Sequence, residues 1–221
     1  MNASRQMLHE TRHWWVRQQL EKHAGNSILD VGCGMLPFLG TMNRAYCEVV
    51  LTDIAPRAGM VRTPVAYDVC TGPLHRTFEV ILCSEVLEHV KEPARAIHSL
   101  AQMMEPNGTL ILTTPQRGSP LELLNKALSI CIVRRVVSRL YQEHVVHMTH
   151  INSMTPRKLT RLFKRAGLQI VEQHFCGLYV PVLAELGGGR WARIAQRLEP
   201  FIARVFRRLL WTQCYILKGG E

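Results

Sequence analysis

Several features that mark membrane-spanning or secreted chains are missing from this 221-residue sequence. No run of apolar residues reaches the roughly 18 that a membrane-spanning helix needs. Residues 1–5 lead into a polar helical stretch, so we expect no signal peptide. The seven cysteines are odd in number, scattered and without a Cys-x-x-Cys pair, which favours reduced thiols. We therefore expect a single cytoplasmic α/β domain over residues 1–221.

The positive charge is unevenly distributed along the chain. Of the net charge of +10, residues 1–116 contribute almost nothing, with 10 Lys and Arg against 11 Asp and Glu. Residues 117–221 hold 17 Lys and Arg against 6 Asp and Glu. The C-terminal half is therefore predicted to face a polyanion, an anionic membrane or an acidic substrate.

Residues 26–37 read Asn-Ser-Ile-Leu-Asp-Val-Gly-Cys-Gly-Met-Leu-Pro, a short apolar strand followed by a glycine turn and the start of a helix. Gly32 and Gly34 let the turn backbone approach a ligand, a geometry that binds nucleotide-like cofactors. A dinucleotide-binding turn needs a further glycine where this chain has Pro37, and a Walker lysine is also absent. These absences turn the prediction away from dinucleotides and nucleoside triphosphates.

Two acidic residues indicate which cofactor the turn binds. Asp30, two residues before Gly32, would repel a pyrophosphate and attract an ammonium group. This favours S-adenosylmethionine, which carries an amino acid head and no phosphate. Asp53 ends the predicted strand 48–53. It follows Gly32 by about 20 residues, the spacing at which a carboxylate accepts hydrogen bonds from ribose hydroxyls.

Three further segments extend this pattern. Residues 66–69 place Asp68 at a strand end, where it is predicted to meet the adenine amino group. Residues 78–90 supply a fourth strand and its loop, and residues 108–115 supply a fifth strand. Four motifs in this order resemble class I S-adenosylmethionine-dependent methyltransferases, over about residues 10 to 175. The family commonly has a third glycine where this chain has Leu36, so a tighter turn around the methionine moiety is expected.

The resemblance implies an α/β Rossmann-like fold with a seven-stranded, mostly parallel sheet and helices on both faces. We expect helix 93–104, a helix beginning at Thr155-Pro156, a strand 168–175, and a last strand 212–218 that runs antiparallel. A helix over residues 7–24 is similar to an N-terminal helix that closes over the cofactor in many bacterial methyltransferases. The predicted cofactor-binding residues are Asp30, Gly32, Cys33, Gly34, Asp53, Ile54, Asp68, Ser84 and Arg17, with Trp14 a further candidate.

A base for the methyl acceptor is sought among acidic residues and histidines. Glu85, Glu88 and His89 stand at positions i, i+3 and i+4, on one side of a helical turn, and His147 lies in a second cluster at residues 143–150. Glu85, His89 and His147 are the predicted catalytic residues. Glu88 and His89 are interpreted either as an anchor for their loop or, with Glu85 and His147, as ligands of a divalent cation. The Glu-x-x-Glu-His run resembles both quinone-biosynthesis O-methyltransferases and small-RNA 2′-O-methyltransferases.

Two predicted helical inserts, residues 119–150 and 177–210, combine apolar faces with many arginines. Each follows a strand expected to run parallel to the first, so both should cover the substrate pocket at the carboxyl edge of the sheet. Their composition favours peripheral contact with an anionic membrane over RNA, because stacking aromatics are scarce, and a solvated surface is the third interpretation.

The predicted function is methylation of a small or lipid-linked acceptor, at oxygen, with S-adenosylmethionine. The first alternative is an enzyme that methylates the 2′-hydroxyl of RNA with the help of a Glu/His metal site. The second alternative is a partner protein that binds the cofactor but does not catalyse a reaction. The same fold serves acceptors from amines to nucleic acids, so the fold does not decide among them.

Overall fold

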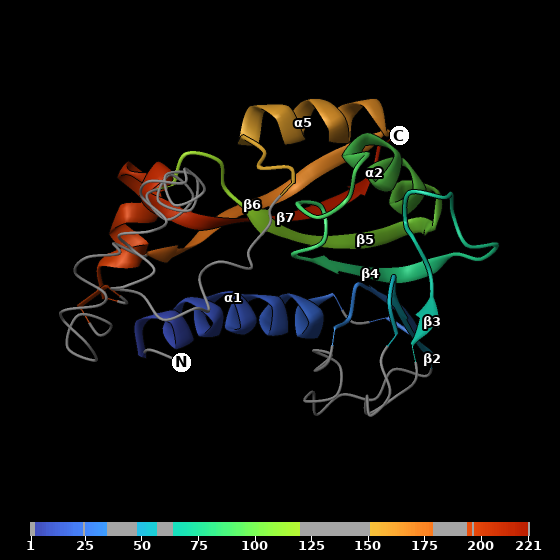
Figure 1. The fold of residues 1–221 in the computed structure, drawn as a ribbon, viewed down its shortest axis with the longest axis horizontal. Helices are drawn as coiled ribbons and strands as arrows, with labels where there is room; N and C mark the ends of the chain where they lie inside the picture. The colour runs from blue at the N-terminus through green and yellow to red at the C-terminus, as the bar shows by residue number, and fades with distance from the viewer. Residues whose placement is uncertain are drawn as a thin grey trace, which may run out of the picture.

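The computed structural model describes residues 3–23, 25–34, 48–56, 64–119, 151–178, 194–195 and 197–220. Within these ranges, seven strands form one sheet in the order β3-β2-β1-β4-β5-β7-β6 (Figure 1). The strands are β1 Ser27–Val31, β2 Glu48–Asp53, β3 Val65–Ala66, β4 Phe78–Ser84, β5 Met104–Pro115, β6 Leu168–Leu178 and β7 Leu210–Gly219. The helices are α1 Ala3–Lys22, α2 Pro93–Gln102, α5 Pro156–Arg165 and the short 3-10 helix η3 Arg207–Leu209, and residues 197–205 are also helical.

Strand direction confirms the predicted mostly parallel sheet. The pairs β1 with β2, β1 with β4, β2 with β3 and β4 with β5 are all parallel. Strand β7 lies between β5 and β6 and is antiparallel to both. The carboxyl ends of the parallel strands therefore meet at one edge, where open α/β sheets bind ligands.

Helices cover both faces of the sheet because its strands are apolar on both sides. In β1, Ile28 faces the layer under α1, whereas Leu29 and Val31 face the opposite side, as the alternation of side chains along a strand requires. Trp15, Val16 and Leu20 of α1 pack on the first face. The second face is covered by α2 and α5 through Ile97, Leu100, Leu159 and Phe163, and Figure 1 shows α1 on one side of the sheet with α2 and α5 on the other.

Helix α5 begins where its sequence predicts. The Thr155 hydroxyl accepts a hydrogen bond from the Lys158 N–H at 3.3 Å. This contact is an N-cap, and Pro156 occupies the first turn. Leu159 and Phe163 are buried on the inward side of this helix.

Strand β6 is longer than the sequence predicts. Gly177 was expected to begin an insert, but it adopts a φ of +82° and the strand continues to Leu178, which pairs with Leu210. The second insert is therefore shorter than residues 177–210, since its first and last residues belong to β6 and β7. Nearly all of the first insert, residues 179–193 and 196 of the second insert, the helix predicted to follow the glycine turn, Leu36 and His147 lie outside the described residues. No helix in the described ranges has the length and apolarity to cross a membrane.

Candidate active site

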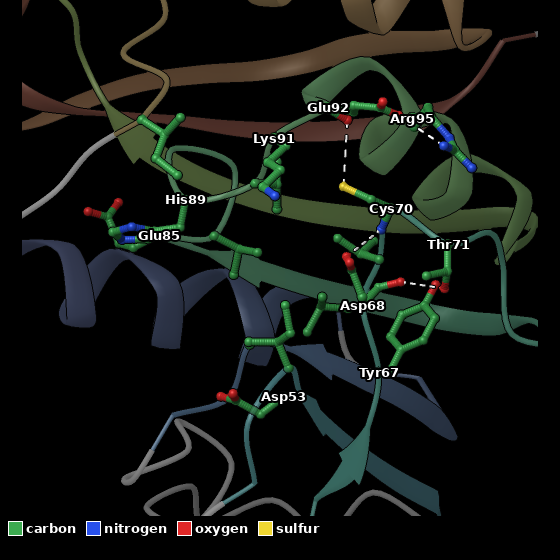
Figure 2. Close-up of a pocket in the computed structure, with 17 residues that line it drawn as sticks. Asp53, Tyr67, Asp68, Cys70, Thr71, Glu85, His89, Lys91, Glu92 and Arg95 are labelled. Atoms are coloured by element: carbon green, nitrogen blue, oxygen red, sulfur yellow. Dashed lines mark hydrogen bonds and ion pairs between the residues drawn. The ribbon is translucent and has the colours of Figure 1, made fainter.

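A cavity of about 660 Å³ opens at the carboxyl ends of β1, β2 and β4. Figure 2 shows Asp53 at the bottom of this cavity, Glu85 and His89 on the side next to α1, and Asp68 on the side away from α1. The residues that line it are Val31, Gly32, Asp53, Ile54, Tyr67, Asp68, Val69, Cys70, Thr71, Glu85, Val86, His89, Val90, Lys91, Glu92, Arg95 and Ile151. Predicted site residues therefore share one space: Gly32, Asp53, Ile54, Asp68, Glu85 and His89 all line it.

The glycine turn after β1 depends on its two glycines. Gly32 and Gly34 have φ values of +68° and +63°. L side chains rarely adopt this backbone conformation. A Cβ atom at Gly32 would lie 2.5 Å from Cγ2 of Val86, on the wall of the cavity. The N–H groups of Gly32 and Cys33 donate to the Thr52 carbonyl at 2.8 and 3.0 Å, which fixes the turn to the end of β2.

Asp53 is held at the mouth of the cavity by backbone donors. Its Oδ2 accepts from the Gly34 N–H at 3.1 Å and its Oδ1 accepts from the Ala55 N–H at 3.0 Å. A carboxylate oxygen accepts more than one hydrogen bond, so both oxygens retain acceptor capacity toward the cavity. The adjacent Ile54 side chain is exposed at the rim.

Asp30 is buried and lies behind the glycine turn, outside the residues that line the cavity. Its Oδ2 is buried and accepts no hydrogen bond in the described part of the chain. Burial, reinforced by the negative charge of Asp53, raises the pKa of Asp30 to about 7. Burial, then Asp30 and Asp53, also raise the pKa of the Cys33 thiol to about 11, so Cys33 is neutral at pH 7. A cationic ligand group near the turn would offset this concentration of negative charge.

Asp68 closes a turn at the far wall of the cavity. Its Oδ1 accepts from the Cys70 N–H at 2.9 Å, and its carbonyl accepts from the N–H and hydroxyl of Thr71. Ser84 is not among the residues that line the cavity. Its hydroxyl is 2.9 Å from the Thr113 hydroxyl, in contact with the neighbouring strand β5.

Glu85 follows β4 and contacts helix α1. Its φ is +58°. Such a value is unusual for a residue with a side chain. Its Oε2 lies 3.0 Å from Nη1 of Arg12 in an ion pair that is largely shielded from solvent, and the Thr113 hydroxyl donates to its Oε1 at 3.0 Å. Sequence reasoning did not identify Arg12 as a site residue.

Arg17 and Trp14 were predicted from sequence as the α1 residues near the cofactor. Both side chains are exposed and neither lines the cavity. The buried side of α1 instead carries Arg12, Trp15 and Val16, because these positions share one helical face. The placement of Arg17 thus differs from the expectation.

Glu88 anchors the loop after β4. Its side chain is 1% exposed, and its Oε2 accepts from the Thr114 hydroxyl at 3.0 Å. Burial, reinforced by the charge of Glu85, raises the pKa of Glu88 well above its ordinary value. Its carbonyl accepts from the N–H groups of Ile151 and Asn152, both at 2.9 Å. These contacts are those of a loop anchor.

His89 is oriented differently from Glu88. Its side chain is half exposed and lines the cavity, with Nε2 at 3.9 Å from Oε1 of Glu88. Among the described residues, no group of three or more His, Cys, Asp and Glu side chains is arranged to hold a metal ion. A metal centre at this edge would need His147 or another ligand from outside the described ranges.

A family model described as "Methyltransferase domain" matches residues 4–173 of the chain. The chain belongs to this methyltransferase family. The match spans the glycine turn, Asp53, Asp68 and the Glu85–His89 loop, and it confirms the predicted class I S-adenosylmethionine-dependent methyltransferase.

Two relatives of this methyltransferase are both named as ubiquinone biosynthesis O-methyltransferases. The mitochondrial ubiquinone biosynthesis O-methyltransferase of Schizosaccharomyces pombe is 31% identical over 62% of this chain and 51% of its own length. The ubiquinone biosynthesis O-methyltransferase of Azoarcus sp. is 28% identical over 67% of this chain and 66% of its own length. The aligned part of the chain thus spans between half and two thirds of these relatives.

Solved structures show the same fold. The N-methyltransferase NodS from Bradyrhizobium japonicum WM9 superposes with a TM-score of 0.59 at 17% identity, covering 97% of each chain. At this identity the likeness concerns the fold of the methyltransferase and not its acceptor.

Proposed function

We propose that this methyltransferase transfers the methyl group of S-adenosylmethionine to a hydroxyl oxygen of a small or lipid-linked acceptor in the cytoplasm. The observation that carries the proposal is the shared cavity, in which a carboxylate suited to ribose, Asp53, and an imidazole, His89, face the same space of about 660 Å³. Membership of the methyltransferase family and the names of the two relatives support it.

The residues present fit the proposed cofactor. Gly32 and Gly34 have positive φ values, which favour glycine. Because glycine has no side chain, the turn leaves room where the methionine part of the cofactor would approach. The buried Asp30 oxygen without a hydrogen-bond donor suits a nearby ammonium group. Asp53 would accept hydrogen bonds from the ribose hydroxyls, and Asp68 would accept from the adenine amino group. S-adenosylmethionine supplies an activated methyl group, so the protein has to align the acceptor and remove its proton.

His89 is the proposed base for the acceptor hydroxyl. It lines the cavity and its half-exposed imidazole can exchange protons with solvent. Glu85 lines the same wall, but its carboxylate is already paired with Arg12 and Thr113, which suits a role in shaping the pocket. Glu88 is buried and engaged with Thr114, which suits a role in holding the loop that presents His89.

The acceptor we propose is a hydroxylated aromatic ring, free or attached to a lipid chain. Val86, Val90 and Ile151 form an apolar part of the cavity wall against which a ring can pack. The two relatives are named for O-methylation in ubiquinone biosynthesis. A ubiquinone ring carries methoxy groups, so we infer for this chain an acceptor with a free phenolic hydroxyl.

To test the proposed function, the purified protein is incubated with S-adenosylmethionine that bears a deuterated methyl group. 3,4-Dihydroxybenzoate, a catechol with a farnesyl chain, and 4-aminobenzoate serve as acceptors, and mass spectrometry detects the transferred methyl. We expect methylation of the two catechols and none of the amine. Methylation of the amine alone, or of no hydroxyl acceptor, would overturn the proposal.

The proposed role of His89 needs a matched comparison. We expect His89→Gln to lower kcat by a factor of about 10² or more, the usual contribution of a general base, with little change in cofactor affinity. His98→Gln, an exposed histidine on α2 outside the cavity, is the control and should retain kcat. Equal activity of the two variants would remove His89 from the mechanism.

A further inference from the structure

The helix at residues 197–205, together with the preceding residues 194–195, is apolar on the side that packs against the sheet. Ala195 is fully buried in a cluster with Phe175, Leu178 and Leu210, and Ile202 and Ala203 pack against the same cluster. The buried Glu199 carboxylate accepts a hydrogen bond from the Leu178 N–H at 3.0 Å, which fastens the helix to the end of β6. One side of this helix is therefore buried against the sheet.

A second side of the same segment, next to the buried one, is apolar as well. Ile194, Leu198, Phe201 and Val205 follow the spacing i, i+4, i+7 and i+11, which places them along one stripe of a helix. Phe206 and Leu209 continue the exposed apolar surface into η3. All six residues are between 40% and 60% exposed. Six large apolar side chains exposed within so short a segment form a patch of the kind that marks a membrane or protein contact.

Arginines accompany this apolar stripe. Arg197, Arg204, Arg207 and Arg208 are exposed, and Arg207 lies over the Phe175 ring at 5.6 Å. Between residues 194 and 209 the sequence has one acidic residue, Glu199, and it is the buried residue that binds Leu178. The outward surface of this segment therefore carries apolar and positive groups, with its acidic group turned inward.

We propose that this surface, the interfacial face, binds an anionic lipid bilayer. It consists of Ile194, Leu198, Phe201, Val205, Phe206 and Leu209 with Arg197, Arg204, Arg207 and Arg208. Apolar side chains that enter the boundary between headgroups and acyl chains, with cations beside them for anionic headgroups, are the chemistry of interfacial helices. A nucleic acid would match the arginines but leave the aliphatic stripe in water.

The interfacial face lies at the same edge of the sheet as the cavity. Figure 1 shows the helix beyond the tips of β4 and β5, where the parallel strands end. Gln116, directly after β5, donates through Nε2 to the carbonyl of Arg207 at 3.1 Å. Bilayer binding itself does not depend on the proposed function. Delivery of a lipid-linked acceptor to the cavity from this face does rest on it.

The test is co-sedimentation of the full purified chain with vesicles made from a two-to-one mixture of phosphatidylcholine and phosphatidylglycerol, and with vesicles of phosphatidylcholine alone. We expect binding to the anionic vesicles that weakens as salt is raised. The double variant Phe201→Ser/Phe206→Ser removes apolar contact, and Arg204→Ser/Arg208→Ser removes two cations. Each should weaken binding to anionic vesicles about tenfold or more.

Matched control variants remove arginines and an apolar side chain that lie outside the interfacial face. Arg161→Ser/Arg165→Ser removes two exposed arginines from α5, and Val171→Ser removes an exposed apolar side chain from β6. Both should bind the vesicles as the unaltered protein does. Near-ultraviolet circular dichroism and calorimetric binding of S-adenosylhomocysteine show that each variant is folded.

The results of the vesicle-binding test can be told apart from the results of the methylation test. Absence of vesicle binding by the unaltered protein, an equal loss in the α5 control, binding to single-stranded RNA in place of vesicles, or a concentration-dependent dimer that buries Phe201 would overturn the inference. Vesicle binding that is lost only in the interfacial variants supports it, whatever acceptor is methylated. Vesicle binding without methylation of any catechol would leave the inference standing and refute the proposed function.

Discussion

The guanidinium of Arg12 lies 3.0 Å from the carboxylate of Glu85 and joins helix α1 to the end of strand β4. The two side chains are 11% and 16% exposed, and Thr113 of β5 donates to the same carboxylate. Three elements that are distant in sequence therefore meet at one acidic group on the cavity wall. This contact holds α1 at the carboxyl edge of the sheet.

Replacing Arg12 by Met should lower the free energy of unfolding by about 2 kcal/mol, because Glu85 then keeps a largely shielded charge without its cation. Urea unfolding of the two proteins measures the difference. Lys22 pairs with Glu172 in an exposed ion pair, so Lys22→Met provides the control. This control should change stability by less than about 1 kcal/mol.

The coupling between Arg12 and Glu85 can be isolated by a double-mutant cycle. Arg12→Met/Glu85→Gln should be less destabilised than the sum of the two single variants, since the second change removes the unpaired charge left by the first. Strictly additive losses would show that the two side chains do not stabilise one another.

Replacing Asp53 by Ala should weaken binding of S-adenosylhomocysteine by about 2 to 3 kcal/mol, since the ribose hydroxyls lose a charged acceptor and the Gly34 N–H loses its partner. Asp53→Asn keeps one acceptor oxygen and should lose less. Titration calorimetry compares both with Glu48→Gln, at the other end of β2, where we expect unchanged affinity. Equal affinity of all three variants would remove Asp53 from the cofactor site.

The two glycines of the turn should respond differently to alanine. Gly32→Ala and Gly34→Ala each place a side chain at positive φ, at a cost of about 1 kcal/mol. Only Gly32→Ala also brings a Cβ to 2.5 Å from Val86, whereas a Cβ at Gly34 meets no atom of the described residues within 4 Å. Thermal unfolding should therefore show the larger loss for Gly32→Ala. Adding Val86→Ala should recover part of that loss, and a failure to do so would argue against the contact.

Asp30 should make the stability of the cofactor-free protein fall as pH rises. Its pKa is raised from 3.8 to about 7 in the folded state, so the folded protein binds the proton more tightly than the unfolded chain. The stabilisation is fully present below pH 3.8 and is lost as pH rises to about 7. One proton corresponds to a slope of about 1.4 kcal/mol per pH unit at most.

The difference in unfolding free energy between the unaltered protein and Asp30→Asn, measured from pH 4.5 to 8, should follow this decline. Asparagine has no proton to lose in this range, so the variant supplies the pH-independent reference at this position. A difference that stays constant over the range would contradict the buried acid.

Most strands could be located from the sequence because each has a strong local signal. The bounds of β2, Glu48–Asp53, agree with the prediction, since an apolar run ends there in an acidic residue. Strand β6 was predicted too short because Gly177 was interpreted as a break. Pairing with β7 carries the strand across this glycine, and pairing between segments distant in sequence has no local signal.

The site was predicted in part for the same reason. Residues at the end of a strand or shortly after it, such as Asp53 and Asp68, are placed by the strand, and both line the cavity. Arg12 was not predicted as a site residue, because this would require knowing which face of α1 is buried. That face includes two polar residues, Arg12 and Gln19, which obscure the helical period of the apolar positions. The ion pair with Glu85 is a tertiary contact, and composition alone does not predict it.

The position of β7 has a consequence for how the chain folds during synthesis. Strand β6 is hydrogen-bonded to no other strand of the described sheet than β7, which itself forms the bridge to β5. Residues 168–178 therefore have to wait for residues 210–219 to leave the ribosome before they join the sheet. Until then, α1 lacks some of its packing partners, because Cys176, Cys214 and Ile216 belong to the apolar layer that it covers. The packing of α1 on the sheet is thus completed only when β7 joins the sheet.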